Sequence, residues 1–176
     1  MTSVYLWIVL IHVASILLLL LMHGGVLAVT YAVREERRPE RLAALLDLSA
    51  RTFDSRRTFG RIFWLDLVIV VVSGVVLMVM GGFWRHVWPW ASIVIFVAIM
   101  VAMTRYGSAP MTGLRRAAGL PYIVRKGMGK PEWMDAETAN PQAIDSVLAA
   151  MSPGYLTAVG AGGFLILLWL MTFKPL

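Results

Sequence analysis

The sequence predicts an all-α integral membrane protein: a bundle of four transmembrane helices with an amphipathic helix on the cytoplasmic side. Of its 176 residues, 59% are hydrophobic and only 15% are charged, whereas a soluble domain is about half apolar and a quarter charged. Four apolar stretches, at about residues 4–33, 62–80, 90–104 and 153–173, have roughly the length of a bilayer-spanning helix. They leave no room for a soluble domain, so residues 1–176 are expected to form one transmembrane domain.

The first apolar stretch, residues 4–33, contains no Asp, Glu, Lys or Arg. As a helix it would be about 45 Å long, longer than a bilayer core of about 30 Å, so it must tilt or protrude. No basic residue precedes it and no cleavage site of small residues follows it, so we expect it to be retained rather than removed as a signal peptide.

Arginines crowd the first polar loop, residues 34–61. Between them, Leu42, Leu45, Leu46 and Phe53 recur at helical spacing, which is typical of an amphipathic helix lying on a membrane surface. We expect these four side chains to face the bilayer. The loop also brings a set of basic residues toward anionic lipid. That set is Arg34, Arg37, Arg38, Arg41, Arg51, Arg56 and Arg57.

The other connections carry their own signals. Gly81 and Gly82 end the second stretch, and Trp84, Trp88 and Trp90 follow as an aromatic belt would at the headgroup level. The second polar loop, residues 105–152, is expected to begin at the end of the third span. Within it, Asn140 and Pro141 look like the cap and first turn of a short helix that runs to about Met151.

Charge asymmetry predicts the orientation. Fourteen of the 16 Lys and Arg residues lie in the loops at residues 34–61 and 105–152. By the positive-inside rule these loops are cytoplasmic, and both termini lie on the extracytoplasmic side. We therefore expect a multi-pass protein of the bacterial cytoplasmic (inner) membrane. The basic residues act as orientation signals, so nucleic acid is not expected as a partner.

Small residues four positions apart predict close helix contacts, because they let helix backbones approach in lipid. Three of the apolar stretches carry such pairs or triplets, so we expect a compact bundle. They are Gly24, Ala28 and Ala32, then Ala98 and Ala102, then Ala158 and Gly162.

The ionisable residues within the apolar stretches are His12, His23 and Asp66. His12 and His23 are 11 residues apart, which places them within about 20° of one helix face and about 16 Å apart along the axis. Two histidines on one face could each supply an axial nitrogen to haem b. The competing interpretation is that both histidines are structural, bonded to the backbone or to Ser and Thr of a neighbouring helix.

Asp66 has two interpretations of its own. It could pair with Arg61 or Arg105 and fix the register of the helices, or it could meet His23 and form a proton relay. Separately, the pair Met22 and His23 offers the thioether and imidazole ligands that suit Cu(I). Methionine is also an ordinary filler of apolar bundles.

The sequence favours a non-enzymatic membrane component. It has no cysteine, and it contains no zinc-protease motif, phosphate-binding glycine loop or paired intramembrane acids. An accessory or structural subunit of a membrane complex, or a self-associating bundle, fits this short polar inventory best. Its partners would be the lipid bilayer and other membrane subunits or itself. The alternatives are a haem b-binding electron carrier that uses His12 and His23, and a copper or proton permease.

Several short motifs resemble those of a known family. They are Ile11-His12-Val13, Met22-His23-Gly24-Gly25, Pro39-Glu40-Arg41, Gly81-Gly82-Phe83-Trp84, Leu114-Arg115-Arg116 and Phe173-Lys174-Pro175. The chain is similar in these motifs to uncharacterised bacterial four-helix integral membrane proteins, which carry a domain of unknown function. Such proteins are distantly similar to membrane proteins of the copper-resistance D type. The resemblance implies a four-helix fold and adds weight to the copper alternative, but it carries no activity.

Overall fold

The computed structural model describes residues 2–53, 57–124 and 132–174. Apart from one short hairpin, the described chain is helical. Its elements in order are α1 (Thr2–Glu35), α2 (Pro39–Phe53), α3 (Thr58–Met80), the 3-10 turn η1 (Phe83–Arg85), α4 (Val87–Met103), the π-helical turn η2 (Thr104–Ser108), α5 (Ala109–Ala117), β1 (Tyr122–Val124), β2 (Glu132–Met134), α6 (Pro141–Ala150) and α7 (Pro153–Phe173).

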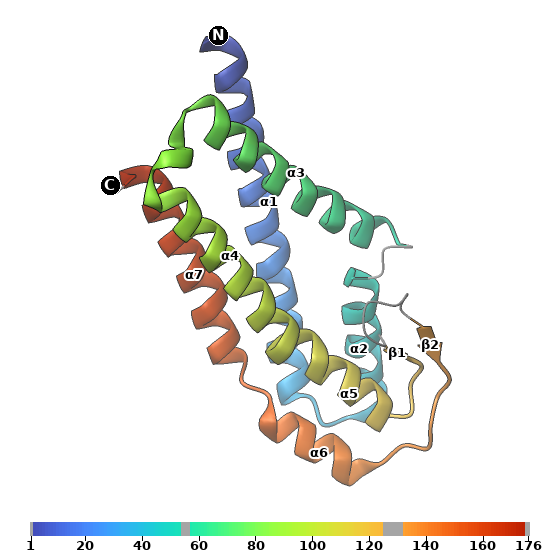
Figure 1. Ribbon diagram of the computed structural model, residues 1–176. Helices are drawn as coiled ribbons and strands as arrows, with labels where there is room; N and C mark the ends of the chain where they lie inside the picture. The colour runs from blue at the N-terminus through green and yellow to red at the C-terminus, as the bar shows by residue number, and fades with distance from the viewer. Residues whose placement is uncertain (1, 54–56, 125–131, 175–176) are drawn as a thin grey trace.

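Four helical segments are long and apolar enough to cross a membrane: Ser3–Glu35, Thr58–Met80, Val87–Ala117 and Pro141–Phe173. The chain is therefore a multi-span membrane protein. Both termini and the α3–α4 turn lie at one end, while α2, α5, α6 and the hairpin lie at the other (Figure 1). We call this second end the basic end, because the two arginine-rich connections run through it.

Helices α1 and α7 hold the spans together. α1 packs against both α3 and α7, and α7 also packs against α4. α3 and α4 leave their common turn in diverging directions (Figure 1). The described spans therefore pack in the order α3–α1–α7–α4, which is more open than the compact bundle expected from the sequence.

The glycines that permit close approach differ from the expected small residues. A Cβ on Gly160 of α7 would lie 2.0 Å from His23 Nε2 on α1, and one on Gly163 would lie 2.5 Å from Ile99 Cδ1 on α4. By contrast, a Cβ on Gly24 or Gly162 would meet nothing within 4 Å. The spacing of small residues in the sequence indicates that helices can approach closely, but it does not show which small residues face a neighbouring helix.

The third helix continues well past the expected end of its span at Thr104. Pro110 has no N–H to donate to the carbonyl four residues earlier, and the chain adjusts just before it. The Ala109 N–H instead bonds the Thr104 carbonyl, five residues back, which makes one π-helical turn. The helix then runs on as α5 to Ala117, so the start of the expected polar loop is helical.

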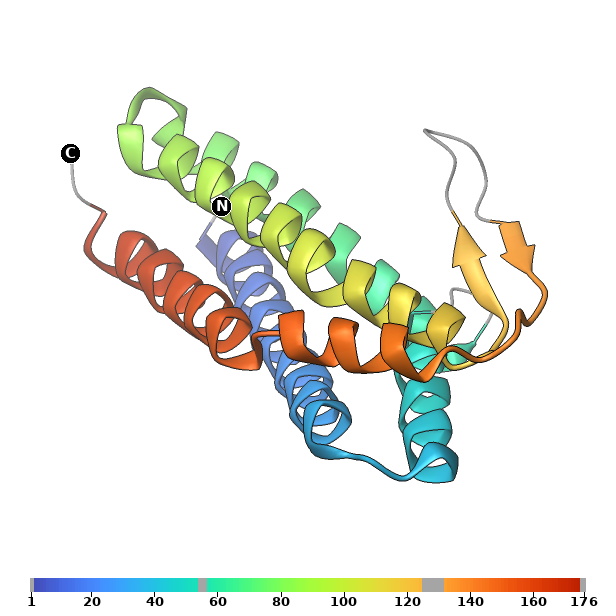
Figure 2. The same cartoon turned by 90° about the horizontal axis from the view of Figure 1, so that it is seen from below.

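A small apolar core closes the basic end. Figure 2 looks at this end and shows α6 lying across it. The end of α1 and helices α2, α5 and α6 contribute the core side chains, three of which are fully buried. The core consists of Val33, Leu42, Leu46, Met111, Leu114, Leu148 and Met151.

This core corrects the expectation for α2. Leu42 is 4% exposed and Leu46 is fully buried, so both pack inside the protein rather than facing the bilayer. Leu45 packs against the same core, and the side chain of Phe53 lies outside the described residues. The helical period of these leucines is correct. The face they define is covered by α1 and α5, and sequence periodicity cannot distinguish a covering helix from lipid.

Candidate functional site

The polar groups of the spans meet between α1 and α3. His12 and Ser15 of α1 are 8% and 7% exposed, while Asp66 and Ser73 of α3 are 3% and 7% exposed. Residues three apart on α1 and seven apart on α3 share one helix face, so these four side chains form a polar strip in an otherwise apolar interface. We call this strip the α1–α3 seam.

The first pair of the seam is His12 with Ser73. His12 Nδ1 lies 2.9 Å from Ser73 Oγ, and the Ser73 hydroxyl donates to the Ile69 carbonyl across 2.5 Å. Because the hydroxyl hydrogen is directed at that carbonyl, we infer that Ser73 Oγ accepts a hydrogen bond from His12 and that Nδ1 carries the ring proton. Gly74 makes room for the ring, since a Cβ there would lie 3.1 Å from His12 Cε1.

The second pair of the seam is Ser15 with Asp66. The Ser15 hydroxyl hydrogen-bonds the Asp66 carboxyl group. The other carboxyl oxygen, Oδ2, is buried and has no hydrogen-bond partner among the described residues. The partner that the structure gives Asp66 is therefore a serine of α1, rather than the arginine or histidine considered from the sequence.

His23 points to a different neighbour from His12. Its ring lies 6.1 Å from that of Phe164 on α7, and its Nε2 is directed at Gly160 of the same helix. This nitrogen is buried and has no hydrogen-bond partner in the described part of the chain. The two histidines of α1 thus contact α3 and α7 respectively.

The residues considered for copper, Met22 and His23, are adjacent on α1. Met22 is 5% exposed and lies inside the protein. Among the described residues, no three His, Asp or Glu side chains come close enough together to hold a metal ion. Any metal at His23 would have to recruit thioether ligands or a second chain.

The arginines of the first polar loop have two kinds of surroundings. Arg34 donates through Nη1 to the carbonyl oxygens of Leu148, Ala149 and Met151, which lie at the C-terminal end of α6. A cation here also complements the helix dipole of α6. Of the other six arginines expected near anionic lipid, five are exposed, and Arg56 lies outside the described residues. The exposed ones are Arg37, Arg38, Arg41, Arg51 and Arg57.

Two ion-pair clusters order the rest of the basic end. In the first, Arg115 of α5 donates through Nη1 to Asp47 of α2 across 2.9 Å and through Nε to the Pro121 carbonyl across 2.8 Å. Arg51 lies 3.6 Å from the same aspartate. The Arg115 side chain is only 10% exposed while that of Asp47 is 50% exposed, so the buried partner of the pair is the cation.

The second cluster joins the end of α5 to the chain between the hairpin and α6. Arg116 lies 3.0 Å from Glu137 Oε2, and the Tyr122 hydroxyl donates to Glu137 Oε1. The hydrogen bond from Tyr122, and then that from Arg116, lowers the pKa of Glu137. The hydrogen bond to Glu137 in turn raises the pKa of Tyr122. Nearby, Asn140 accepts from the Ala143 N–H, which confirms the predicted cap of α6.

Sequence analysis missed three of the residues that organise these clusters. Ser15 and Ser73 lie at helical spacings of three and seven from His12 and Asp66, and that periodicity is a signal that could have marked the α1–α3 seam. Arg115 was counted only as a basic orientation signal, and nothing in its local sequence shows that it would be buried.

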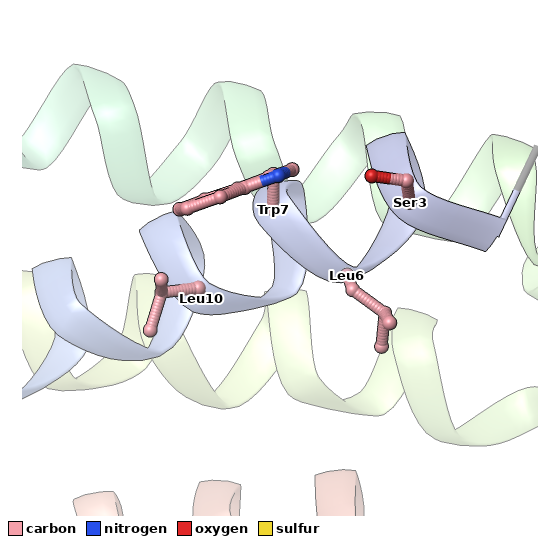
Figure 3. Close-up of a pocket in the computed structure, with 4 residues that line it drawn as sticks. All are labelled: Ser3, Leu6, Trp7 and Leu10. Atoms are coloured by element: carbon pink, nitrogen blue, oxygen red, sulfur yellow. The ribbon is translucent and has the colours of Figure 1, made fainter.

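A shallow groove lies at the start of α1 on the described surface. It is lined by Ser3, Leu6, Trp7 and Leu10, and Figure 3 shows all four side chains on the same helix. The groove therefore lies along the face of a single helix, and it contains no titratable side chain.

Comparison of the chain with protein-family models, with curated proteins and with solved structures finds no match.

Proposed function

We propose that the protein is a non-enzymatic component of the bacterial cytoplasmic membrane that acts by associating with another membrane helix, most simply that of a second copy of itself. Its contact surface is the outward face of α1. The observation that carries this proposal is the small-residue triplet Gly24, Ala28 and Ala32, which is exposed along its whole length.

The position of this triplet supports the proposal. At about 100° per residue, it lies on the side of α1 roughly opposite the buried residues Ser15, Leu19 and Val33. A glycine in a helix costs about 0.5–1 kcal/mol relative to alanine. Gly74, Gly160 and Gly163 compensate for this cost by making room for a neighbouring side chain. At Gly24 no neighbour in the described part of the chain lies within 4 Å, whereas a second helix at this face would gain close backbone contact.

The rest of the same face fits a helix partner. Trp7, Leu10, Leu17 and Leu21 lie within about 60° of the centre of the triplet around the helix and are 55–74% exposed. The groove of Figure 3 belongs to this face, where Leu10 and Trp7 form its apolar wall. On this face the N-terminal half of α1 carries large apolar side chains and the C-terminal half carries small ones. A partner helix could therefore pack closely against the C-terminal half and contact large side chains along the N-terminal half.

Single-cysteine cross-linking tests the proposal directly, because the chain has no cysteine of its own. One cysteine at a time replaces Gly24, Ala28 or Ala32 in the full chain, and the protein is oxidised in lipid vesicles. Self-association through α1 predicts covalent dimers at these three positions. Leu18→Cys and Leu20→Cys are the matched controls, since both residues are 38–39% exposed but lie about 80° to either side.

Two outcomes would contradict self-association at this face. One is equal cross-linking at the triplet and at the control positions, and the other is no cross-linking at any of them. If the protein cross-links to a different membrane protein from native membranes through the same three positions, the accessory-subunit form of the proposal replaces the self-association form.

A haem b carrier is the second candidate. The observation in its favour is the hydrogen bond from His12 Nδ1 to Ser73, because a ligating histidine usually has its other nitrogen held in this way. The backbone of Gly160 against His23 Nε2 means that haem at His23 would require α1 and α7 to separate. A visible absorption spectrum of the purified protein tests this candidate: a Soret band that is lost in His12→Ala would favour it over a structural role.

Metal analysis on the same sample addresses the copper alternative at Met22 and His23.

A further inference from the structure

We infer that Asp66 is a proton-binding site: a neutral carboxylic acid between α1 and α3 that takes up and releases one proton. The inference goes beyond the proposed association and does not depend on it. It rests on the surroundings of one side chain in the α1–α3 seam.

Burial is the first step of the argument. Asp66 is 3% exposed and lies eight residues inside α3, in a helix whose neighbouring side chains are apolar. An ionised carboxylate in such surroundings is costly unless it is paired, whereas the neutral acid costs far less. The structure pairs one part of the carboxyl group with the uncharged hydroxyl of Ser15 and leaves the buried Oδ2 without a hydrogen-bond partner among the described residues.

The second step decides between a proton and a metal cation. A bound cation would need several oxygen ligands around it. α1 and α3 are continuous α-helices on either side of the seam, so their backbone carbonyls are engaged in the helices. In the described structure, Asp66 and Ser15 are therefore the oxygen ligands at this position. They are too few to coordinate a metal cation, but Oδ2 of Asp66 can carry a proton.

The third step concerns the other titratable and charged groups that face this region. On α1, His12 lies three residues from Ser15, about 4.5 Å along the helix axis, and its Nδ1 proton is directed at Ser73. α2 also packs against α3, but its charged pair Asp47 and Arg51 is 50–63% exposed. Arg61, five residues before Asp66 on α3, is exposed. His12 is therefore the group best placed to exchange a proton with Asp66.

The chemistry is simple. Proton release breaks the Oδ2–H bond and leaves a carboxylate that accepts from Ser15, while the proton passes to water or to the unprotonated ring nitrogen of His12. Release places a charge in the α1–α3 seam, and uptake removes it. Proton occupancy thus becomes coupled to how closely α1 and α3 pack.

Infrared spectroscopy of the full chain in lipid vesicles at neutral pH tests the inference without requiring a reagent to reach the site. The chain has 10 Asp and Glu residues, and the neutral-acid carbonyl band expected from one of them should disappear in Asp66→Asn. Asp145→Asn is the matched control, because Asp145 lies exposed on α6 and its replacement should remove only carboxylate bands.

Ser15→Ala is the second variant, and it keeps the acid in place if Asp66→Asn does not fold. Loss of the Ser15 hydrogen bond should move the carbonyl band to higher frequency without abolishing it. The inference is overturned if wild-type protein at neutral pH shows no neutral-acid band that depends on Asp66 or Ser15. It is also overturned if added sodium at fixed pH converts the band into carboxylate bands, because that result would assign a cation site instead.

Discussion

Arg115 of α5 donates to Asp47 of α2 across 2.9 Å and to the Pro121 carbonyl across 2.8 Å. Through these contacts a single guanidinium joins two helices and the chain that leads into the hairpin. Removal of this buried arginine takes away the side-chain donor of the Pro121 carbonyl, whereas the half-exposed Asp47 keeps Arg51 as a partner.

We predict that Arg115→Ala lowers the free energy of unfolding by about 1–3 kcal/mol, the usual cost of leaving buried hydrogen-bonding groups without partners. Unfolding is followed by tryptophan fluorescence during titration with a denaturing detergent. Arg51→Ala is the control. Its side chain is 63% exposed, and an exposed ion pair contributes about 0–1 kcal/mol. Equal losses in the two variants would mean that Arg115 has no special role at the basic end.

The helix contact at Gly160 gives a second prediction. A Cβ at this position would lie 2.0 Å from His23 Nε2, so Gly160→Ala must push α1 and α7 apart or rotate the histidine. We expect a loss of about 1–3 kcal/mol, as for other overpacked interiors. Gly162→Ala, two residues away with nothing within 4 Å, should be neutral or stabilising. His23→Ala should rescue Gly160→Ala, and failure of this double variant to recover stability would show that the clash involves another group.

The cluster around Glu137 predicts a pH dependence. The folded pKa of Glu137 is lowered from its ordinary value of 4.5, first by Tyr122 and then by Arg116. A lowered carboxyl pKa stabilises the fold above the unfolded value, and this contribution fades as the pH falls through the folded value. Tyr122→Phe should move the pKa of Glu137 upward, which can be measured by NMR of carboxyl-labelled glutamate. An unchanged titration in Tyr122→Phe would mean that the hydrogen bond does not exist in solution.

Orientation can be tested with reporters. Because fourteen of the 16 basic residues lie in the two connections of the basic end, that end should be cytoplasmic and both termini extracytoplasmic. An enzyme reporter that works only outside the cytoplasm should be active when fused after residue 174, and a cytoplasm-only reporter should be silent there. The opposite pattern would reverse the topology.

The exposed arginines Arg37, Arg38 and Arg41 should enrich anionic lipid around the protein. Each basic residue near an anionic surface contributes about 1 kcal/mol. Replacing all three with glutamine should therefore reduce the anionic lipid that co-purifies, as measured by mass spectrometry of bound lipids. Arg85→Gln, at the opposite end and beside Trp84, is the control and should leave the lipid composition unchanged.

Hydropathy was sufficient to predict four long apolar helices, because the length of an apolar run is a local property of the sequence. The partners of each helix were not predictable in the same way. Leu42 and Leu46 show the helical period equally well whether lipid or α1 and α5 cover them. Gly24 and Gly160 look alike in the sequence, although only Gly160 accommodates a neighbour. His12 and His23 share a face of α1, yet the tilts of α3 and α7 decide which helix each histidine meets.

The π-helical turn at Thr104–Ser108 has a consequence for how one long helix serves two environments. The extra residue in that turn rotates everything after it by about 100° relative to an uninterrupted α-helix. α4 directs Ile99 at α7, while beyond the turn Met111 and Leu114 enter the core at the basic end. The turn thus changes the rotational register of the helix, so that the apolar residues before it face α7 and those after it face the core at the basic end.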